Sequence, residues 1–268
     1  MTRKLFKLFA IAAALLTGSP AIASPARIPP SWDTWSVDCG NSGICFASTF
    51  VRGQATWVDV RVVRDWQANA DPLLRITTNT PLADDGEIRL SVDGQLEDTL
   101  PIAHLREIQA SVTSPSGFRP IGGEGFWYPT GQATRALLKK ISKGAVLTIE
   151  LPIAPEKTQV DVALSGLKPA LSWIDERQTR NGTASAIINP GTEQSIDAPH
   201  ADPVTSPDEL PPAVHTVWGK SRSCAVIDPA IFASLDAVAM PLGDTSVLYI
   251  LPCGAPGAYN APYTAILA

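Results

Sequence analysis

The sequence predicts a mainly β fold with a few helices, in which an antiparallel β sandwich or barrel-like first domain precedes a small disulfide-bridged C-terminal α+β module. Short stretches with apolar residues at every second position alternate with turn residues. A proline-rich stretch with few apolar residues then separates this region from a compact end. These observations divide the chain into a signal peptide at 1–23, a β-rich domain at 24–189, a linker at 190–212 and a C-terminal module at 213–268.

The first residues have the pattern of an export signal. Basic residues precede an apolar stretch from Leu5 to Leu16, and Ala21 to Ala23 gives the small-x-small pattern of a cleavage site. We therefore expect cleavage near Ala23 and a periplasmic location. A membrane anchor is the alternative, but the apolar run is shorter than the roughly 20 residues that span a bilayer.

The charge balance disfavours nucleic acid and anionic lipid surfaces as partners. Loss of the signal segment reduces the 21 Lys and Arg residues to 18 against 26 Asp and Glu, which is a net charge of -8. A surface of that sign repels phosphate groups. No later stretch is long and apolar enough to predict a membrane span in the mature chain.

Alternating apolar residues predict the strands of the first domain. Thr56 to Val63 and Glu87 to Val92 each direct valine, isoleucine or leucine side chains to one side. Leu73 to Thr77 is a further expected strand. The pair Asp93-Gly94 is typical of a tight hairpin turn.

Helical and strand patterns alternate in the second half of this domain. Gly131 to Lys143 predicts a helix with Thr130 as its cap. Ala145 to Leu151 and Gln159 to Leu164 predict two strands that pair as a hairpin. Lys168 to Arg180 predicts a second helix, because a proline fits its first turn and an Asn-Gly pair follows it.

Aromatic residues have a structural and a binding interpretation. Residues Ser114 to Pro129 are rich in Gly and Pro and predict a long loop that closes over the sheet. A packed lid is the simpler interpretation, and ligand binding through Phe126, Trp127 and Tyr128 is the alternative. The tryptophans near the strands are expected to fill the core or cover an edge, with a platform that stacks on sugars as the alternative: Trp32, Trp35, Trp57 and Trp66.

The end of the chain predicts a linker and a small module. Pro190 to Pro212 holds six prolines among acids, serines and threonines, which predicts an extended linker. The 56 residues from Ala213 onward offer little core of their own. A disulfide, or docking onto the first domain, is therefore needed to hold this module.

Four cysteines lie as one close pair and one wider pair: Cys39, Cys45, Cys224 and Cys253. In an exported protein this even number predicts two disulfides. Of the three possible connectivities, Cys39 with Cys45 and Cys224 with Cys253 is favoured, because each bridge then closes a loop within one segment. A zinc site is the alternative, but the spacing is not Cys-x-x-Cys. We predict no metal and no cofactor.

Leu171 to Ile187 concentrates charge in a chain that otherwise has little of it. Asp175 and Glu176 are adjacent on the predicted helix and point about 100° apart, so they do not form the facing carboxyl pair of a glycoside hydrolase. Glu176 and Arg180 stand four residues apart in the order that stabilises a helix. A structural role is favoured, with ligand binding by Arg177 and Arg180 as the first alternative and catalysis by Asp175 as the second.

Two sets of residues carry a family resemblance. The first runs from Leu164-Ser165-Gly166-Leu167 through Trp173-Ile174-Asp175-Glu176, and the second joins Leu248 to Cys253 with Gly257-Ala258-Tyr259-Asn260. Both resemble an exported proteobacterial family, the domain of unknown function 1176. The first domain is similar in outline to the invasion-associated locus B family of β-rich exported proteins. These resemblances imply a periplasmic location and supply no catalytic residues.

The search for catalytic motifs gives no match to a Gly-x-Ser-x-Gly elbow, a His-Glu-x-x-His helix, a phosphate loop or a Cys-x-x-Cys redox pair. The leading hypothesis is therefore a non-enzymatic periplasmic protein that binds an envelope component or a protein. The expected contact regions are the aromatic loop and the loop with Tyr259 and Asn260. An envelope hydrolase built on Asp175 and a structural or stress-related envelope protein are the alternatives.

Overall fold

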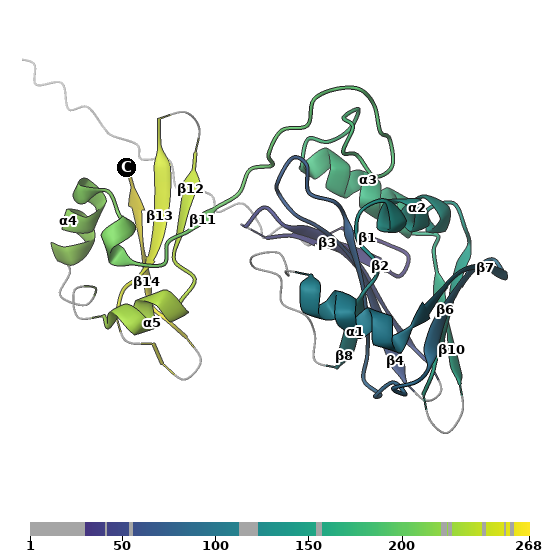
Figure 1. Ribbon diagram of the computed structural model, residues 1–268. Helices are drawn as coiled ribbons and strands as arrows, with labels where there is room; N and C mark the ends of the chain where they lie inside the picture. Colours follow the sequence, from purple (N-terminus) through teal and green to yellow (C-terminus); the bar gives the residue numbers. More distant parts are fainter. Residues whose placement is uncertain are drawn as a thin grey trace, which may run out of the picture.

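The computed structural model describes residues 30–268 except 41, 54–55, 113–122, 154–156, 221–223, 225–226, 243–244, 255 and 258–259. The predicted signal peptide lies outside the described residues. Figure 1 shows a large β-rich unit beside a smaller unit formed by the C-terminal part of the chain. We call them the first module and the C-terminal module.

The first module contains two antiparallel sheets. One has the order β1-β2-β3-β4-β5-β8 and the other the order β10-β9-β6-β7. The strands of the first sheet are β1 (Ser31–Trp32), β2 (Trp35–Cys39), β3 (Cys45–Arg52), β4 (Trp57–Arg64), β5 (Leu73–Thr78) and β8 (Glu124–Trp127). Those of the second are β6 (Glu87–Val92), β7 (Gln95–Pro101), β9 (Val146–Leu151) and β10 (Thr158–Ala163). Both sheets are open, so the fold is a sandwich and not a barrel.

The core lies between the two sheets because each strand directs alternate apolar side chains inward. Val58, Val60 and Val62 of β4 are fully buried, as are Ile88 and Leu90 of β6. The helix α3 (Leu167–Arg177) packs against β1, β2 and β3, and α1 (Ile102–Ser111) packs against β7 and β8, while α2 (Gln132–Ile141) is the remaining helix of this module (Figure 1). The predicted mainly β, antiparallel architecture is confirmed.

Most local predictions hold, with differences at element ends. Asp93 and Gly94 both have positive φ in the turn between β6 and β7, as the hairpin predicts. Helix α2 is present, but its N-cap is Gly131 with no side-chain hydrogen bond, so the prediction of Thr130 as the cap is wrong. The predicted loop 114–129 contains strand β8, and its residues 114–122 lie outside the described part of the chain.

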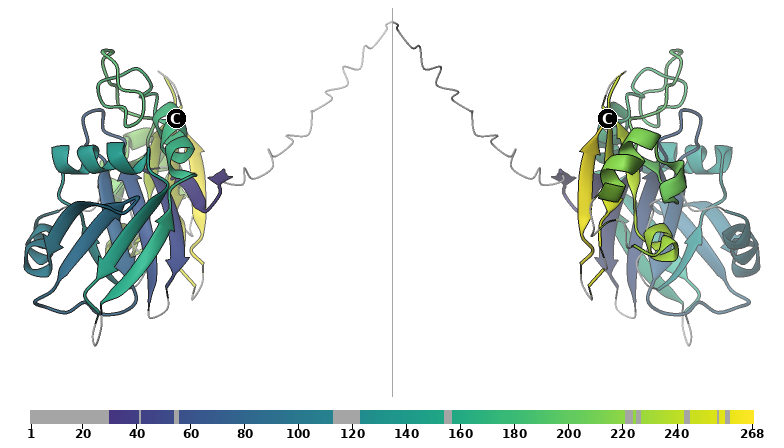
Figure 2. Two further views of the ribbon diagram at one scale, coloured as in Figure 1. Left: turned by 90° about the vertical axis from the view of Figure 1, so that its right-hand side faces the viewer. Right: turned by 90° about the vertical axis from the view of Figure 1, so that its left-hand side faces the viewer.

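The C-terminal module is a four-stranded antiparallel sheet with helices on one face (Figure 2). It contains β11 (Asp202–Pro203), α4 (Pro212–Lys220), α5 (Pro229–Ser234), β12 (Val238–Pro241), β13 (Val247–Pro252) and β14 (Tyr263–Leu267). Trp218, Phe232 and Leu251 lie at the centre of its own hydrophobic cluster, separate from the core of the first module. The predicted α+β character of this module is confirmed.

Both predicted disulfides are present. Cys39 and Cys45 bridge β2 to β3 where the two strands pair, and Cys224 and Cys253 join the start of the segment after α4 to the end of β13. The described part of the chain contains no free cysteine. None of the helices in that part is long and apolar enough to cross a membrane.

The segment between the two modules contacts both of them. Asp197 accepts a hydrogen bond from the backbone N–H of Ala68, and the His200 ring stacks on the Trp66 indole with centroids 3.6 Å apart. Asp202–Pro203 then adds a strand to the C-terminal sheet. The segment is therefore packed on the first module near residue 200, which its proline content did not predict. The domain boundaries stay a prediction.

Candidate functional site

The charged stretch at the end of α3 forms a buried polar cluster. Asp175 is fully buried, and its Oδ2 accepts hydrogen bonds from the backbone N–H groups of Ile187 and Ile188, at 2.8 and 3.0 Å. Burial raises the pKa of the Asp175 carboxyl, against the opposing effects of these two hydrogen bonds and of the nearby Arg64 and Arg180 guanidinium groups. The carboxylate ties the chain after α3 back to the helix.

Arg180 holds a loop of the first module through its side chain. Helix α3 ends at Arg177, and Thr179 has a positive φ of 54°, so the chain turns and Arg180 points inward with no exposed surface. Its guanidinium donates to backbone carbonyls between residues 65 and 68 at distances of 2.7 to 3.1 Å. Burial lowers the pKa of Arg180. The expected helical pair between Glu176 and Arg180 is wrong, because Arg180 lies beyond the helix.

Arg64 completes the cluster, and no pattern in the sequence singles it out. It is fully buried at the end of β4 and donates to the carbonyls of Ala70 and Ser185, at 2.7 and 2.5 Å. Burial, with the like charge of Arg180 as the next cause, lowers the pKa of Arg64 to about 9. Arg64 and Arg180 both donate to backbone carbonyls, so the cluster holds the loops of this fold together.

The aromatic residues predicted to bind a ligand face the interior. Phe126, Trp127 and Tyr128 have exposed fractions of 4%, 0% and 5%. The Arg75 guanidinium lies 5.1 Å from the centre of the Trp127 ring, and the Tyr128 hydroxyl donates to Asp98 Oδ2 at 2.6 Å. Burial and this hydrogen bond raise the pKa of Tyr128. In this structure none of the three rings is presented to solvent.

The second predicted contact region is the loop after β13. Asn260 is exposed, and its backbone carbonyl accepts a hydrogen bond from Gly257 at 2.7 Å. Tyr259 lies outside the described residues. The role of Tyr259 and Asn260 in binding stays a prediction.

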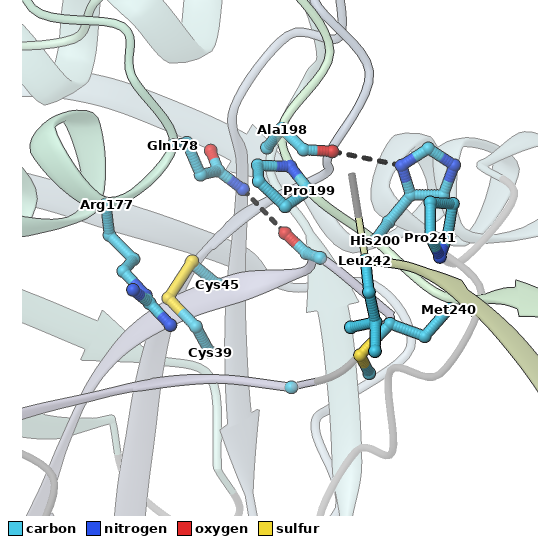
Figure 3. Close-up of a pocket in the computed structure, with 12 residues that line it drawn as sticks. Cys39, Cys45, Arg177, Gln178, Ala198, Pro199, His200, Met240, Pro241 and Leu242 are labelled. Atoms are coloured by element: carbon cyan, nitrogen blue, oxygen red, sulfur yellow. Dashed lines mark hydrogen bonds between the residues drawn. A yellow bond between two sulfur atoms is a disulfide. The ribbon is translucent and has the colours of Figure 1, made fainter. Parts of the chain in front are cut away.

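A cleft of about 340 Å³ lies between the two modules. Figure 3 shows the side chains around it. Four separate segments supply its lining: Cys39, Gly40, Gly43 and Cys45; Arg177 and Gln178; Ala198, Pro199 and His200; Met240, Pro241 and Leu242. Pockets of about 300 to 1,000 Å³ are the size that usually takes small ligands. We therefore consider this cleft the candidate site.

Arg177 is the charged residue of the cleft that remains available. It is exposed at the last turn of α3, and it makes no hydrogen bond or ion pair with any residue that the structure describes. Figure 3 shows its side chain beside the Cys39–Cys45 disulfide. Of the three charged residues predicted for this region, Arg177 alone borders the cleft, while Asp175 and Arg180 support it from within.

The wall near the disulfide is held in place by close packing. Gln178 donates through Nε2 to the carbonyl of Gly43 at 2.8 Å, which ties α3 to the turn between β2 and β3. Gly43 has a φ of +76°, and a Cβ at this position would lie 2.7 Å from Cβ atoms of His200 and Trp66. Only glycine fits this contact without a shift of the chain. Gln178 and Gly43 are positioning residues that the sequence did not reveal.

The opposite wall is largely apolar. Met240 and Leu242 come from β12 and the residue after it, and Leu242 is 52% exposed. His200 also lines the cleft, with Nδ1 at 3.0 Å from the carbonyl of Ala198 and Nε2 at 3.2 Å from Asp202 Oδ1. Both of its ring nitrogens therefore already have partners.

A smaller cavity of about 210 Å³ lies between α1 and β8. Its walls are mostly the apolar side chains of Leu82, Ile102, Leu105 and Phe126. Its cation, Arg106, is paired with Asp84 at 2.6 Å and lies 3.8 Å from Glu124. Among the described residues, no group of three or more His, Cys, Asp or Glu side chains is placed to hold a metal ion. The cation of this smaller cavity is thus already paired, whereas Arg177 in the cleft between the modules has no partner among the described residues.

Comparison with known proteins gives a family match and a curated relative. A family model described as a protein of unknown function (DUF1176) matches residues 30–268. The uncharacterized protein YpfG of Escherichia coli K12 is 30% identical over 206 residues, which are 75% of this chain and 52% of YpfG. The chain therefore spans about half the length of the curated relative it matches.

A solved structure to which the chain is similar is that of invasion associated protein B from Bartonella henselae. The identity is 18%, the TM-score is 0.39, and the match covers 57% of this chain and 99% of the other. The family model thus confirms the resemblance to the domain of unknown function 1176 that the sequence motifs indicate.

Proposed function

The chain belongs to the DUF1176 family, and on this premise we propose that it is an exported, non-enzymatic protein that binds a small molecule of the cell envelope in the cleft between its modules. Two disulfides support export, since such bonds persist in oxidising compartments such as the periplasm. The basic and apolar start of the chain supports it as well.

One observation carries the binding proposal. The cleft of about 340 Å³ has an exposed guanidinium, that of Arg177, without a partner among the described residues. Charged side chains on a protein surface gain hydrogen-bonding strength when a ligand excludes water from them. An unpaired cation at the wall of a cavity is therefore a suitable anchor for a ligand.

The burial of Asp175 supports a non-enzymatic role. This residue was the carboxylate chosen for the alternative of an envelope hydrolase, and a general acid or base must come within hydrogen-bond distance of its substrate. Asp175 has no exposed surface, and one of its oxygens already accepts two backbone N–H groups. Its contacts are those of a structural carboxylate.

The binding proposal is tested by thermal shift of the mature protein with a panel of envelope-derived small molecules. We expect at least one compound to raise the unfolding temperature in a saturable way, because a ligand that binds only the folded state stabilises it. The shift should disappear in Arg177→Gln and persist in Arg52→Gln, which removes an exposed arginine of β3 outside the cleft. Equal shifts in both variants would place the ligand elsewhere.

Export is tested separately. Fractionation of host cells followed by mass spectrometry of the intact protein should find a periplasmic chain that begins near Ser24 and carries both disulfides. A full-length cytoplasmic chain with free thiols would contradict this part of the proposal.

A further inference from the structure

The charge of the cleft lining differs from that of the chain. The whole sequence has 26 acidic against 21 basic residues, yet the described lining contains an arginine and a histidine and no Asp or Glu. His200 has partners at both ring nitrogens. Arg177 is therefore the free cationic group that a ligand meets among the lining residues, and no carboxylate of the lining competes for it.

One wall of the cleft is suited to apolar atoms. Met240, Pro241 and Leu242 form one wall, and Ala198 and Pro199 continue it. The Cys39–Cys45 disulfide borders the cleft on the side of Arg177 (Figure 3). A thioether, a disulfide and aliphatic side chains attract apolar groups through dispersion and through the release of water. The cleft thus has a cationic group, Arg177, on one side and an apolar wall, Met240 to Leu242, on the other.

From this arrangement we propose that the cleft takes a small amphiphile, with one oxyanion head group bound by Arg177 and a short apolar tail packed on Met240 and Leu242. The inference rests on the proposed function and specifies its ligand. A guanidinium presents paired N–H donors that match the two oxygens of a carboxylate or a phosphate ester. Head groups of both kinds share this chemistry.

The size of the cleft limits the tail. Its volume of about 340 Å³ lies near the lower end of the range of about 300 to 1,000 Å³ for small-ligand pockets. A chain of medium length fits such a volume better than a long lipid chain, whose outer part would stay in water. We therefore use probes with eight-carbon tails.

The experiment is isothermal titration of the mature, disulfide-bonded protein with octanoate, octyl phosphate, octanol and inorganic phosphate. Octanoate and octyl phosphate should bind with one site, and the tighter of the two identifies the head group. Octanol and inorganic phosphate should each bind at least tenfold more weakly, because each lacks one of the two interactions. A charge-assisted hydrogen bond corresponds to a factor of about 10 to 100 in affinity, so Arg177→Gln should weaken the anionic probes by that factor.

Two further variants separate the head from the tail. Leu242→Ser should weaken the octyl probes severalfold and leave the ratio between octanoate and octanol unchanged, because it alters the apolar wall alone. Arg52→Gln should change nothing, since this residue does not border the cleft. Circular dichroism of each variant checks that the fold is intact.

The outcomes distinguish the two proposals. If octanol binds as tightly as octanoate, or if Arg177→Gln leaves the affinity for octanoate unchanged, the inferred ligand class is wrong. If a compound from the envelope panel binds in an Arg177-dependent way and no octyl anion displaces it, the ligand class is again wrong and the proposed function stands. If neither the panel nor the probes bind, both proposals fail.

Discussion

The two modules of the chain are stabilised by different means. In the first module, two sheets enclose a continuous core that extends from Trp35 to Ile174. The C-terminal module has one sheet with helices on one face, and its smaller cluster centres on Trp218 and Phe232. Strand β14 at its edge alternates between exposed and half-buried residues and buries none of them fully. A domain with little buried apolar area depends more on each contact and on covalent links.

The largest effect is expected for Trp218→Ala. The Trp218 indole donates to the carbonyl of Pro252 at 3.0 Å and meets the Phe232 ring edge-on at 5.7 Å. Loss of a buried tryptophan costs about 3 to 5 kcal/mol, which is comparable to the whole stability that such a small module can have. Hydrogen exchange followed by mass spectrometry should show loss of protection in β12 and β13 and retention in β4 and β5.

The matched control is Trp35→Ala in the first module. Trp35 is fully buried and donates to the carbonyl of Ala163 at 2.8 Å, so the deleted side chain is equivalent. The same loss should lower the unfolding free energy of the first module without unfolding it at 25 °C. Equal protection of β13 in the native protein and in Trp218→Ala would contradict the expected difference between the modules.

The next effect is expected for the disulfides. Cys224 and Cys253 close a loop with a separation of 29 residues, whereas Cys39 and Cys45 are 6 residues apart. The loop-entropy relation gives about 3.5 kcal/mol for the first and about 2 kcal/mol for the second. We expect the double alanine variant at Cys224 and Cys253 to unfold the C-terminal module before the first module in urea. The double alanine variant at Cys39 and Cys45 should lower only the urea midpoint of the first module. A larger loss of stability in this variant than in the Cys224 and Cys253 variant would contradict the prediction.

Helices and strands of both modules could be predicted where the spacing of apolar residues within the segment itself indicates the element. Glu87 to Val92 alternates strictly, and the structure has β6 over the same residues. The pattern does not predict helix α1, although Ile102, Leu105 and Ile108 recur at helical spacing after Pro101, because the segment is short and polar overall. The pattern also does not predict strand β8, because its aromatic residues follow a Gly- and Pro-rich run.

The candidate site depends on contacts that a local pattern does not contain. The sequence selected Arg177 and Arg180 together, but the end of α3 and the positive φ of Thr179 send one outward and the other into the core. The backbone carbonyls between residues 65 and 68 that accept from Arg180 lie more than 100 positions away in the chain. The cleft itself requires four distant segments to meet, which spacing along one sequence does not specify.

A smaller, pH-dependent effect is expected for Asp175→Asn. Burial raises the pKa of Asp175 above its ordinary value of 3.8 in the folded state, so the folded protein binds this proton more tightly than the unfolded chain. The contribution of Asp175 to stability is therefore fully present below pH 3.8 and is lost as the pH rises through the folded pKa. Asparagine does not titrate and can still accept from Ile187 and Ile188.

The pH-dependent contribution of Asp175 to stability is measured by urea unfolding of the first module between pH 3 and pH 7. The unfolding free energy of the native protein minus that of Asp175→Asn should decrease as the pH rises from about 4. The contribution of Glu209 to the stability of the C-terminal module should depend on pH in the opposite direction. Hydrogen bonds from Thr205 lower the pKa of this exposed carboxyl, so its contribution is lost as the pH falls. A difference between native and variant that stays constant over this range would show that Asp175 does not titrate as the structure implies.

The smallest effect on stability is expected where the two modules meet. Trp66 and His200 stack with an angle of 12° between their rings, and aromatic pairs of this kind contribute about 0.5 to 1.5 kcal/mol. Trp66→Ala should leave the unfolding of each module nearly unchanged, because neither hydrophobic cluster contains this residue. It should broaden the distribution of distances between spin labels placed on α2 and α4. Trp57→Ala, which removes the tilted Phe50–Trp57 pair of the first sheet, is the matched control and should leave that distribution unchanged. An unchanged distribution in Trp66→Ala as well would mean that other contacts fix the orientation of the modules and the width of the cleft.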